Sequence, residues 1–183
     1  MGSNKTEILN KSDSGFWHLG RDEFERSVSR LELAIFHVYE SIERWEKECI
    51  SAVEPGQSIA GHDSTLLHSI RSYDRPKGVS ELAQFLNRDD IANIQYSLRK
   101  MQKSGLIQKS KESGSRKDMT YEVTEYGRQL TDGFGDVRTK VLINSFRQAS
   151  FDKERIDELA DLVILLVGLY ESSGRSAMME RLR

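Results

Sequence analysis

The stretch that decides the fold is Val79-Ser-Glu-Leu-Ala-Gln-Phe-Leu-Asn-Arg-Asp-Asp-Ile-Ala-Asn-Ile-Gln-Tyr-Ser-Leu-Arg-Lys-Met-Gln-Lys-Ser-Gly-Leu-Ile107. Its first part predicts a short helix over residues 80–86, with Ser80 as the N-cap and one apolar face. Its second part predicts a helix over about residues 90–104, capped by Asp89 and ended by Gly105 in a left-handed conformation. The apolar residues of this second helix follow helical spacing, which predicts that they are buried: Ile91, Ile94, Leu98 and Met101. Two short helices joined by a tight turn are typical of a helix-turn-helix, whose second helix enters the major groove of DNA.

The residues after the second helix predict a β-hairpin. Leu106-Ile107 begins one strand. In the other strand, Met119, Tyr121 and Val123 alternate with polar residues, a period of two that is typical of a strand. The connecting residues 109–117 are polar and basic. This pattern predicts a protruding basic tip, a wing, beside the helix-turn-helix.

This segment resembles the MarR-type winged-helix transcription regulators. Three motifs carry the resemblance, in the order and at the spacing of that family: Ser80-Glu-Leu-Ala83, Leu98-x-x-Met-x-x-x-Gly-Leu-Ile107 and Val123-Thr-x-x-Gly127. The match covers about residues 66–130. The wing of the family usually contains Asp-x-Arg, but Ser115 and Lys117 stand at those positions here and Arg116 lies one residue away. Which side chain takes the role of the family's arginine is therefore open.

The charge distribution points in the same direction as the motifs. The chain of 183 residues has a net charge of only −2. Residues 88–118, however, include 8 basic and 4 acidic residues, whereas the remainder of the chain has 19 basic and 25 acidic residues. A basic patch on an acidic body is typical of a protein that binds phosphate with one face. The bland alternative is that these charges form only a solvated surface.

The N-terminal half contains a long predicted helix, residues 21–54, with a repeat of 3.5 residues. Its apolar positions alternate in steps of four and three: Phe24, Val28, Leu31, Ile35, Val38, Ile42, Trp45 and Cys49. We call these eight residues the heptad stripe. Such a repeat is typical of a coiled-coil contact and requires a partner helix from the same chain or from another.

The C-terminal part, residues 128–183, predicts further helices. A helix capped by Thr124 is expected over residues 125–147, weakened or bent by Gly133 and Gly135. Another is expected over residues 152–170, followed by a tail that is frayed or contains one short helix. Its segment 162–169, which includes Leu162, Leu166 and Leu169, is apolar on every side and must be covered on every side. Together with the heptad stripe, this segment predicts a homodimer.

The predicted architecture is mainly α (α+β): a winged helix-turn-helix core over residues 62–127 with N- and C-terminal dimerisation helices, preceded by a flexible N-terminus, residues 1–20. The resemblance implies the same organisation. It also implies an effector pocket between the dimer helices and the DNA-binding core, for a small aromatic or anionic compound. Five aromatic residues are candidates to line such a pocket, although each fits a core position equally well: Phe16, Trp17, Phe36, Tyr39 and Trp45.

Candidate contacts with double-stranded DNA fall into two classes. For base edges, the exposed face of the second helix offers amide, guanidinium and aromatic groups, namely Asn93, Gln95, Tyr96 and Arg99. For phosphates, which position a protein without specifying sequence, the candidates are Ser80, Arg88, Lys100, Lys103, Lys109 and Lys111. Arg116 and Lys117 are candidates for a minor groove. Asp89 and Asp90 are explained by capping and the helix dipole, or by a contact with cytosine.

Other functional classes find less support in the sequence. No metal-ligand spacing, phosphate-binding loop or nucleophile elbow is present, so neither an enzyme nor a cofactor is expected. His62 and His68 are surface histidines or a weak metal or proton sensor. Cys49 is inert packing or, as in some relatives of the family, an oxidant sensor. The winged helix could also serve as a protein–protein module, but such a module would not need a basic wing.

The expected location is the cytoplasm. The single cysteine excludes an internal disulfide and fits a reducing compartment. The longest apolar run, residues 162–167, is far shorter than the roughly 20 residues that span a bilayer. No membrane contact is therefore expected.

Overall fold

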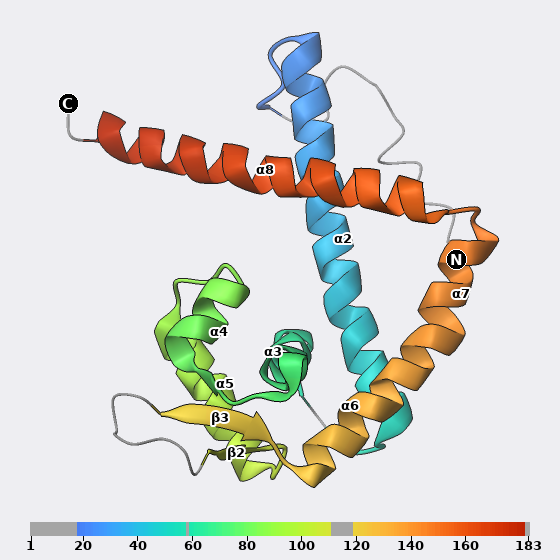
Figure 1. Cartoon of the computed structure of the whole chain (residues 1–183). Helices are drawn as coiled ribbons and strands as arrows, with labels where there is room; N and C mark the ends of the chain where they lie inside the picture. The colour runs from blue at the N-terminus through green and yellow to red at the C-terminus, as the bar shows by residue number, and fades with distance from the viewer. Residues whose placement is uncertain (1–17, 58, 111–118, 182–183) are drawn as a thin grey trace. The chain divides into compact units, whose positions relative to one another are not determined.

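The structure is a computed structural model that describes residues 18–57, 59–110 and 119–181. It divides into two compact units, one reaching to Gly135 and the other beginning at Asp136. The first unit contains α2 (Glu23–Val53), α3 (Gly61–Arg71), α4 (Val79–Phe85), α5 (Ile91–Lys103), most of α6 (Glu125–Arg138), and the strands β1 (Lys77–Gly78), β2 (Ile107–Lys109) and β3 (Thr120–Val123) (Figure 1). This unit is mainly helical with one small sheet, which confirms the predicted fold class and the predicted winged helix.

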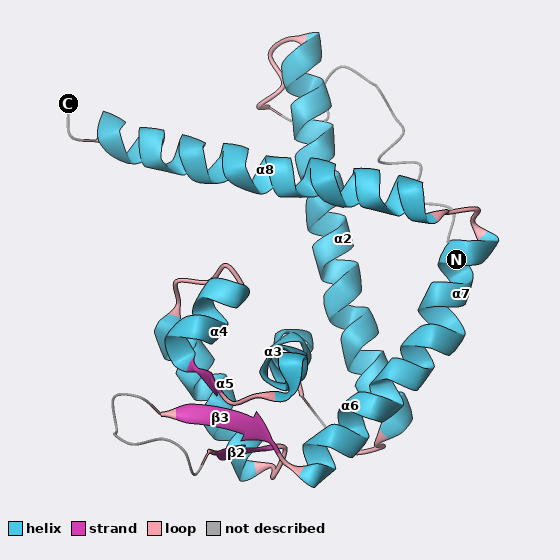
Figure 2. Ribbon diagram, viewed as in Figure 1, coloured by secondary structure: helices cyan, strands magenta, loops and turns pink. Residues whose placement is uncertain are grey.

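The sheet has three antiparallel strands in the order β1-β3-β2 (Figure 2). Ile107 pairs with Val123 and Lys109 with Tyr121, which confirms the predicted hairpin. β1 was not predicted, because two residues are too short to show an alternating pattern. By pairing Lys77 with Tyr121, β1 connects the start of α4 directly to the wing.

The helix-turn-helix is formed by α4 and α5, with helix starts that differ from those predicted. α4 begins at Val79 with Gly78 as its N-cap, so the prediction that Ser80 caps it is wrong. Glu81 takes the usual place of a capping-box acid, since its carboxylate accepts a hydrogen bond from the backbone N–H of Gly78. α5 is capped at Asp90, not at Asp89.

The buried face of α5 follows the helical pattern with one exception. Ile94, Leu98 and Met101 are buried as predicted, but Ile91 is 39% exposed. It stands in the first turn, ahead of the packed part of the helix. Gly105 has φ +72° and ends α5 as expected. The packing of α5 on α3 through these residues fixes which side of the helix faces outward.

α3 forms the centre of this unit, and its end is closed by a buried lysine. Leu66, Leu67 and Ile70 are buried as predicted. Lys77 is only 1% exposed, and its Nζ donates hydrogen bonds to the carbonyl oxygens of Ile70 at 3.0 Å and Arg75 at 3.3 Å and to that of Ser72. Burial lowers the pKa of this amine. A lysine in this place satisfies carbonyl groups that a helix C-terminus leaves without partners.

Glycines in α6 permit two close approaches to other elements. A Cβ on Gly127 would collide with the carbonyl oxygen of Leu106, and one on Gly133 would lie 2.5 Å from Cγ1 of Val53. Thr124 caps α6 as predicted, with its Oγ1 accepting from the Gly127 N–H at 3.0 Å. The glycine at position 133 is thus explained by packing against α2, where the sequence predicted only a weakened or bent helix.

The second unit consists of the end of α6, a π-helical segment Thr139–Ile143, α7 (Asn144–Gln148) and α8 (Lys153–Glu180). The helix predicted over residues 125–147 is therefore interrupted by a π-helical turn. Asp152 caps α8 by accepting from the Arg155 N–H at 2.9 Å. α8 continues to Glu180, so the prediction that this helix ends at residue 170 is wrong. The tail contains no proline, and Gly174 alone costs a helix only about 1 kcal/mol.

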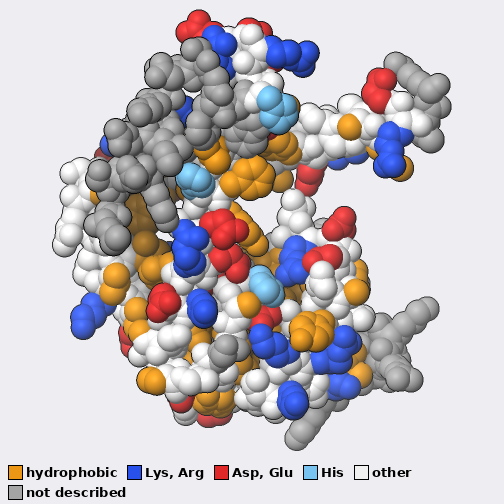
Figure 3. Space-filling view, turned by 180° about the vertical axis from the view of Figure 1, so that it is seen from behind, with side chains coloured by type: hydrophobic (Ala, Val, Ile, Leu, Met, Phe, Trp, Pro, Cys, Tyr) orange, Lys and Arg blue, Asp and Glu red, His pale blue; other side chains and the backbone are white. Residues whose placement is uncertain are grey.

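The long helices carry apolar side chains that the isolated chain leaves exposed. In the heptad stripe these are Phe24, Val28, Leu31, Ile35, Val38 and Ile42, whereas Cys49 is buried. In α8 no residue is buried. Figure 3 shows hydrophobic side chains uncovered among charged ones on one face of the molecule. Within the described ranges, none of the helices is both long and apolar enough to cross a membrane.

Candidate nucleic-acid interface

A groove lies between the recognition helix α5, the start of α4 and the strands of the wing. Its lining residues come from all three elements: Gly78, Val79, Ser80, Ile91, Gln95, Arg99, Gln102, Lys109, Met119, Thr120 and Tyr121. Four predicted DNA contacts, Ser80, Gln95, Arg99 and Lys109, are thereby brought to one surface. They come from residues up to 29 positions apart in the chain, so the fold, and not their spacing, assembles them.

The groove-facing side of α5 is set by its buried side. Ile91, Gln95 and Arg99 are spaced four positions apart in the chain and therefore lie on one face of α5. The buried side chains of Ile94 and Leu98 anchor the adjoining face. Sequence analysis missed Ile91 as a groove residue because its apolar side chain matched the core pattern. An exposed apolar group at this position suits contact with the methyl group of thymine.

Asn93 and Tyr96 are exposed but are not among the residues that line the groove. The Nδ2 of Asn93 donates a hydrogen bond to Oδ2 of Asp90 at 3.1 Å. Tyr96 has its ring largely in solvent. Of the four predicted base-reading residues, Gln95 and Arg99 therefore line the groove, whereas Asn93 and Tyr96 do not.

Arg88 and Asp90 form a two-point ion pair at the start of α5. Nε of Arg88 lies 2.8 Å from Oδ1 of Asp90, and its terminal nitrogen lies 2.6 Å from Oδ2. The hydrogen bonds from Arg88 and then Asn93 lower the pKa of Asp90 to about 2. Asp90 is thus ionised throughout the physiological pH range, and the positive charge of Arg88 is matched in the free protein.

Lys100 is also engaged within the protein. Its Nζ lies 2.7 Å from Oδ2 of Asp63, whose side chain is almost fully buried in α3. Burial alone would raise the pKa of Asp63, but hydrogen bonds from Lys100 and Ser97 and the charge of Lys100 outweigh it, and the pKa lies below its ordinary value. This ion pair fastens α5 to α3. Lys103, one turn further on, is exposed.

Three predicted contacts, Lys111, Arg116 and Lys117, lie outside the described residues, as does Ser115. Which side chain replaces the family's arginine in the wing is therefore still open. The described part of the wing contributes Lys109 from β2 and Thr120 and Tyr121 from β3 to the groove.

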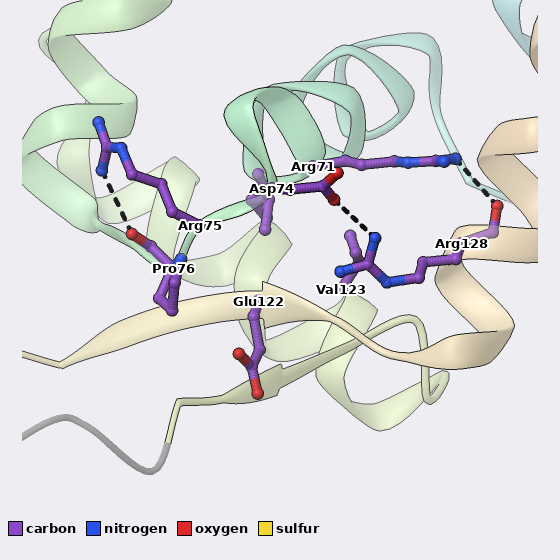
Figure 4. Close-up of a pocket in the computed structure, with 8 residues that line it drawn as sticks. Arg71, Asp74, Arg75, Pro76, Glu122, Val123 and Arg128 are labelled. Atoms are coloured by element: carbon purple, nitrogen blue, oxygen red, sulfur yellow. Dashed lines mark hydrogen bonds and ion pairs between the residues drawn. The ribbon is translucent and has the colours of Figure 1, made fainter.

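A second, small cleft lies where the loop after α3 meets β3 and α6, and it contains three arginines (Figure 4). Arg128 pairs with Asp74 at 2.6 Å, and Arg71 pairs with Asp132 at 2.6 Å. Arg75 donates to Glu81 of α4 at 3.1 Å. Each guanidinium thus has a carboxylate partner within the protein. The pairs of Asp74 and Arg75 connect the start of α6 and the start of α4 to the α3–β1 loop, where Tyr73 and Asp74 have positive φ. The pair of Arg71 connects the end of α3 to the middle of α6.

The remaining candidates lie elsewhere in the first unit. Cys49 is 3% exposed, and burial, followed by the charge of Glu46, raises the pKa of its thiol. Trp45 is partly buried, and its ring packs edge-on against that of Phe134, with the ring centroids 5.3 Å apart. Phe36 and Tyr39 are exposed on α2, while Phe16 and Trp17 fall outside the described residues. Among the residues with described positions, no group of three or more potential ligands could hold a metal.

Comparisons with known proteins agree with this geometry. Residues 60–127 match the family model of a winged helix DNA-binding domain. No curated protein matches the chain. Among solved structures, a MarR family regulator from Neisseria meningitidis is 13% identical, with a TM-score of 0.65 over 80% of this chain and 95% of that one.

Two further solved structures carry bound molecules. A mutant MarR from E. coli complexed with operator DNA is 16% identical, with a TM-score of 0.62 over 76% of this chain and 95% of that one. A MarR from Staphylococcus aureus in complex with salicylate and kanamycin is 12% identical, with a TM-score of 0.58 over 80% of this chain and 96% of that one. The likeness confirms, at the level of the fold, the resemblance to MarR-type winged-helix regulators.

Proposed function

We propose that this protein, a winged-helix protein with the fold of the MarR regulators, binds double-stranded DNA in a sequence-specific manner and regulates transcription. The observation that carries the proposal is the groove beside α5. It gathers hydrogen-bonding, cationic and apolar side chains between a recognition helix and a wing. The match of residues 60–127 to a winged helix DNA-binding domain supports the same function.

The groove offers each kind of contact that base recognition requires. Gln95 can pair through two hydrogen bonds with adenine and Arg99 with guanine, while Ile91 suits the thymine methyl group. Ser80, Lys103 and Lys109 are proposed to contact phosphates, which set the position of α5 on the duplex. Arg116 and Lys117 remain proposed wing contacts with the DNA backbone or a minor groove.

The proposed working unit is a homodimer on a pseudo-palindromic operator. Its support is the exposed apolar surface of the long helices, Phe24 to Ile42 in the heptad stripe and residues 162–169 in α8. A two-fold dimer is the commonest arrangement by which identical chains cover such surfaces. It would place two recognition helices about one turn of DNA apart, roughly 34 Å.

An effector that controls DNA binding is part of the proposal. Salicylate, an aromatic anion and one of the two ligands named for the Staphylococcus aureus structure, supports a small aromatic or anionic compound as the class of effector. In this chain the exposed rings of Phe36 and Tyr39 on α2 are the described candidates for contact. The alternative of redox control through Cys49 is disfavoured by its burial and raised thiol pKa.

The proposal is tested by selecting bound sequences from random duplex DNA. We expect a pseudo-palindromic consensus to emerge. Gln95→Ala should then weaken binding to the consensus by about 1–3 kcal/mol and leave binding to unrelated DNA almost unchanged, because base contacts specify and phosphate contacts do not. Titration of labelled duplexes followed by fluorescence anisotropy measures both affinities.

The matched control is Gln129→Ala, an exposed glutamine of α6 that does not line the groove. It should leave both affinities unchanged. Equal weakening by Gln95→Ala on the consensus and on unrelated DNA would assign Gln95 to phosphate contact. Failure of the unmodified protein to enrich any sequence would contradict sequence-specific binding.

A further inference from the structure

Asp90 occupies the N-cap of the recognition helix without performing the usual task of a cap. Its side chain accepts no hydrogen bond from the backbone N–H groups of α5. It accepts instead from two nitrogens of the Arg88 guanidinium, Nε at 2.8 Å and Nη2 at 2.6 Å, and from the Asn93 amide at 3.1 Å. Capping therefore does not explain this carboxylate.

The three residues stand where a helix-turn-helix meets DNA. The N-terminal residues of a recognition helix are the ones that approach base edges in the major groove. A carboxylate at this place is repelled by phosphates, and here it also holds the cation that phosphates would attract. The Arg88 and Asp90 side chains are 24% and 38% exposed, so the pair is within reach of an approaching duplex.

We propose that Asp90 competes with DNA phosphates for Arg88 and so lowers the phosphate-driven affinity of the protein for all DNA. The inference rests on the proposed DNA binding. A two-point contact of a guanidinium with a carboxylate has the same geometry as its contact with a phosphate. While Asp90 holds Arg88, the protein neutralises one phosphate fewer and releases fewer counterions on binding.

The competition is permanent and does not depend on pH in the physiological range. Hydrogen bonds from Arg88 and Asn93 keep the pKa of Asp90 at about 2. Because a phosphate contact carries no sequence information, the competition should lower affinity for every duplex by a similar factor and leave the ratio between specific and unrelated DNA unchanged. The sequence-reading contacts of Gln95 and Arg99 belong to the next turns of α5 and are left intact.

The test measures binding to a mixed-sequence duplex as a function of salt concentration. Asp90→Asn removes the competing charge and frees Arg88. Its affinity should rise about threefold to tenfold near 50 mM salt, and the slope of log K against log salt should steepen by about 0.9, the value for one added phosphate contact. Asp90→Glu, which keeps the charge, should retain the slope of the unmodified protein.

Two further variants separate this role from general electrostatics and from helix capping. Asp89→Asn removes an equal charge next to Asp90, but Asp89 is exposed and forms no ion pair in the described part of the chain. It should change the slope much less. The double variant Arg88→Ala/Asp90→Asn removes cation and competitor together and should return to the slope of the unmodified protein.

Each result has a defined meaning once circular dichroism has shown that the variants are folded. Equal effects of Asp89→Asn and Asp90→Asn, or an unchanged slope in Asp90→Asn, would overturn the competition. So would a loss of consensus binding alone, which would assign Asp90 to a base contact. Absence of salt-dependent binding by the unmodified protein would contradict the proposed function itself, not only this inference.

Discussion

Gly127, the first glycine of α6, lies where the helix passes the backbone of the wing. The carbonyl oxygen of Leu106 accepts hydrogen bonds from the Thr124 N–H at 3.0 Å and from its hydroxyl at 3.2 Å. A Cβ on Gly127 would collide with this same oxygen. The close approach gives a physical reason for the glycine in Val123-Thr-x-x-Gly127.

Replacing Gly127 with alanine should destabilise the protein by about 1–3 kcal/mol, the usual cost of forcing an extra methyl group into a packed site. Gly135→Ala is the matched control in the same helix, because its Cβ would meet nothing within 4 Å. This control should stabilise the protein by about 0.4–1 kcal/mol by restricting the unfolded chain. Urea unfolding measures the free energy of unfolding of both variants. A change of the same sign in the two variants would contradict the collision.

Cys49 is expected to be packing and not a sensor. Its Sγ lies 3.7 Å from the carbonyl oxygen of Phe134, and burial raises the pKa of its thiol, which leaves little of the reactive thiolate at neutral pH. Cys49→Ser should therefore bind DNA and respond to peroxide in the same way as the unmodified protein, as judged by DNA titration with and without oxidant. An oxidant response that disappears in the variant would establish the redox alternative.

At the scale of elements, the orientation of α5 depends on the ion pair between Lys100 and Asp63 as well as on its apolar face. Lys100→Met should destabilise the protein at neutral pH by about 1–3 kcal/mol because Asp63 stays buried without its cation. This is less than the roughly 3–5 kcal/mol typical of fully buried pairs, since Lys100 is partly exposed to water. Lys103→Met, an exposed lysine of the same helix, should have little effect.

The pH dependence of this destabilisation has a definite sign. In the unmodified protein the pKa of Asp63 lies below its ordinary value of 3.8, so its contribution to stability is complete above that pH and is lost as the pH falls through the folded-state pKa. Lys100→Met removes the hydrogen bond and the charge of Lys100, which lower this pKa, so the pKa of Asp63 should rise. The difference in stability from the unmodified protein should then shrink as the pH falls toward 4. Thermal unfolding of both proteins between pH 4 and 7 measures this difference in stability. A difference that does not change with pH would exclude Asp63 as the source of the destabilisation.

At the scale of the whole molecule, the proposed homodimer is formed by the exposed apolar surfaces of α2 and α8. Leu31→Glu and Leu166→Glu should each yield monomers that remain folded, because Leu31 is exposed and Leu166 partly exposed in the isolated chain. Affinity for a two-half-site operator should fall strongly, since linked half-sites contribute affinity that one module lacks.

Sedimentation equilibrium at micromolar concentration measures the assembly state, and circular dichroism the helix content. Ser172→Glu places the same charge on an exposed residue of α8 outside segment 162–169 and should remain a dimer. A mass of 21.0 kDa for the unmodified protein would contradict the dimer and leave the apolar surface of α8 without an explanation.

The sequence by itself determined the elements whose signals are local. Helical spacing identified Ile94, Leu98 and Met101 as the buried face of α5, and Gly105 and Thr124 marked a helix end and a helix start correctly. These signals work because a helix repeats over short distances and because caps act on neighbouring residues. The same local logic misplaced the cap of α4 by two residues and that of α5 by one, where Asp89 and Asp90 in succession could each serve.

Only the tertiary structure decided how residues far apart in the chain are used. The strand β1, the closing of α3 by Lys77 and the pairing of Lys100 with Asp63 depend on long-range neighbours that no local pattern contains. Ile91 shows the limit most clearly: its spacing matches the core, but in the first turn of α5 it is 39% exposed and lines the groove. Burial depends on what packs against a residue, which is a property of the folded chain.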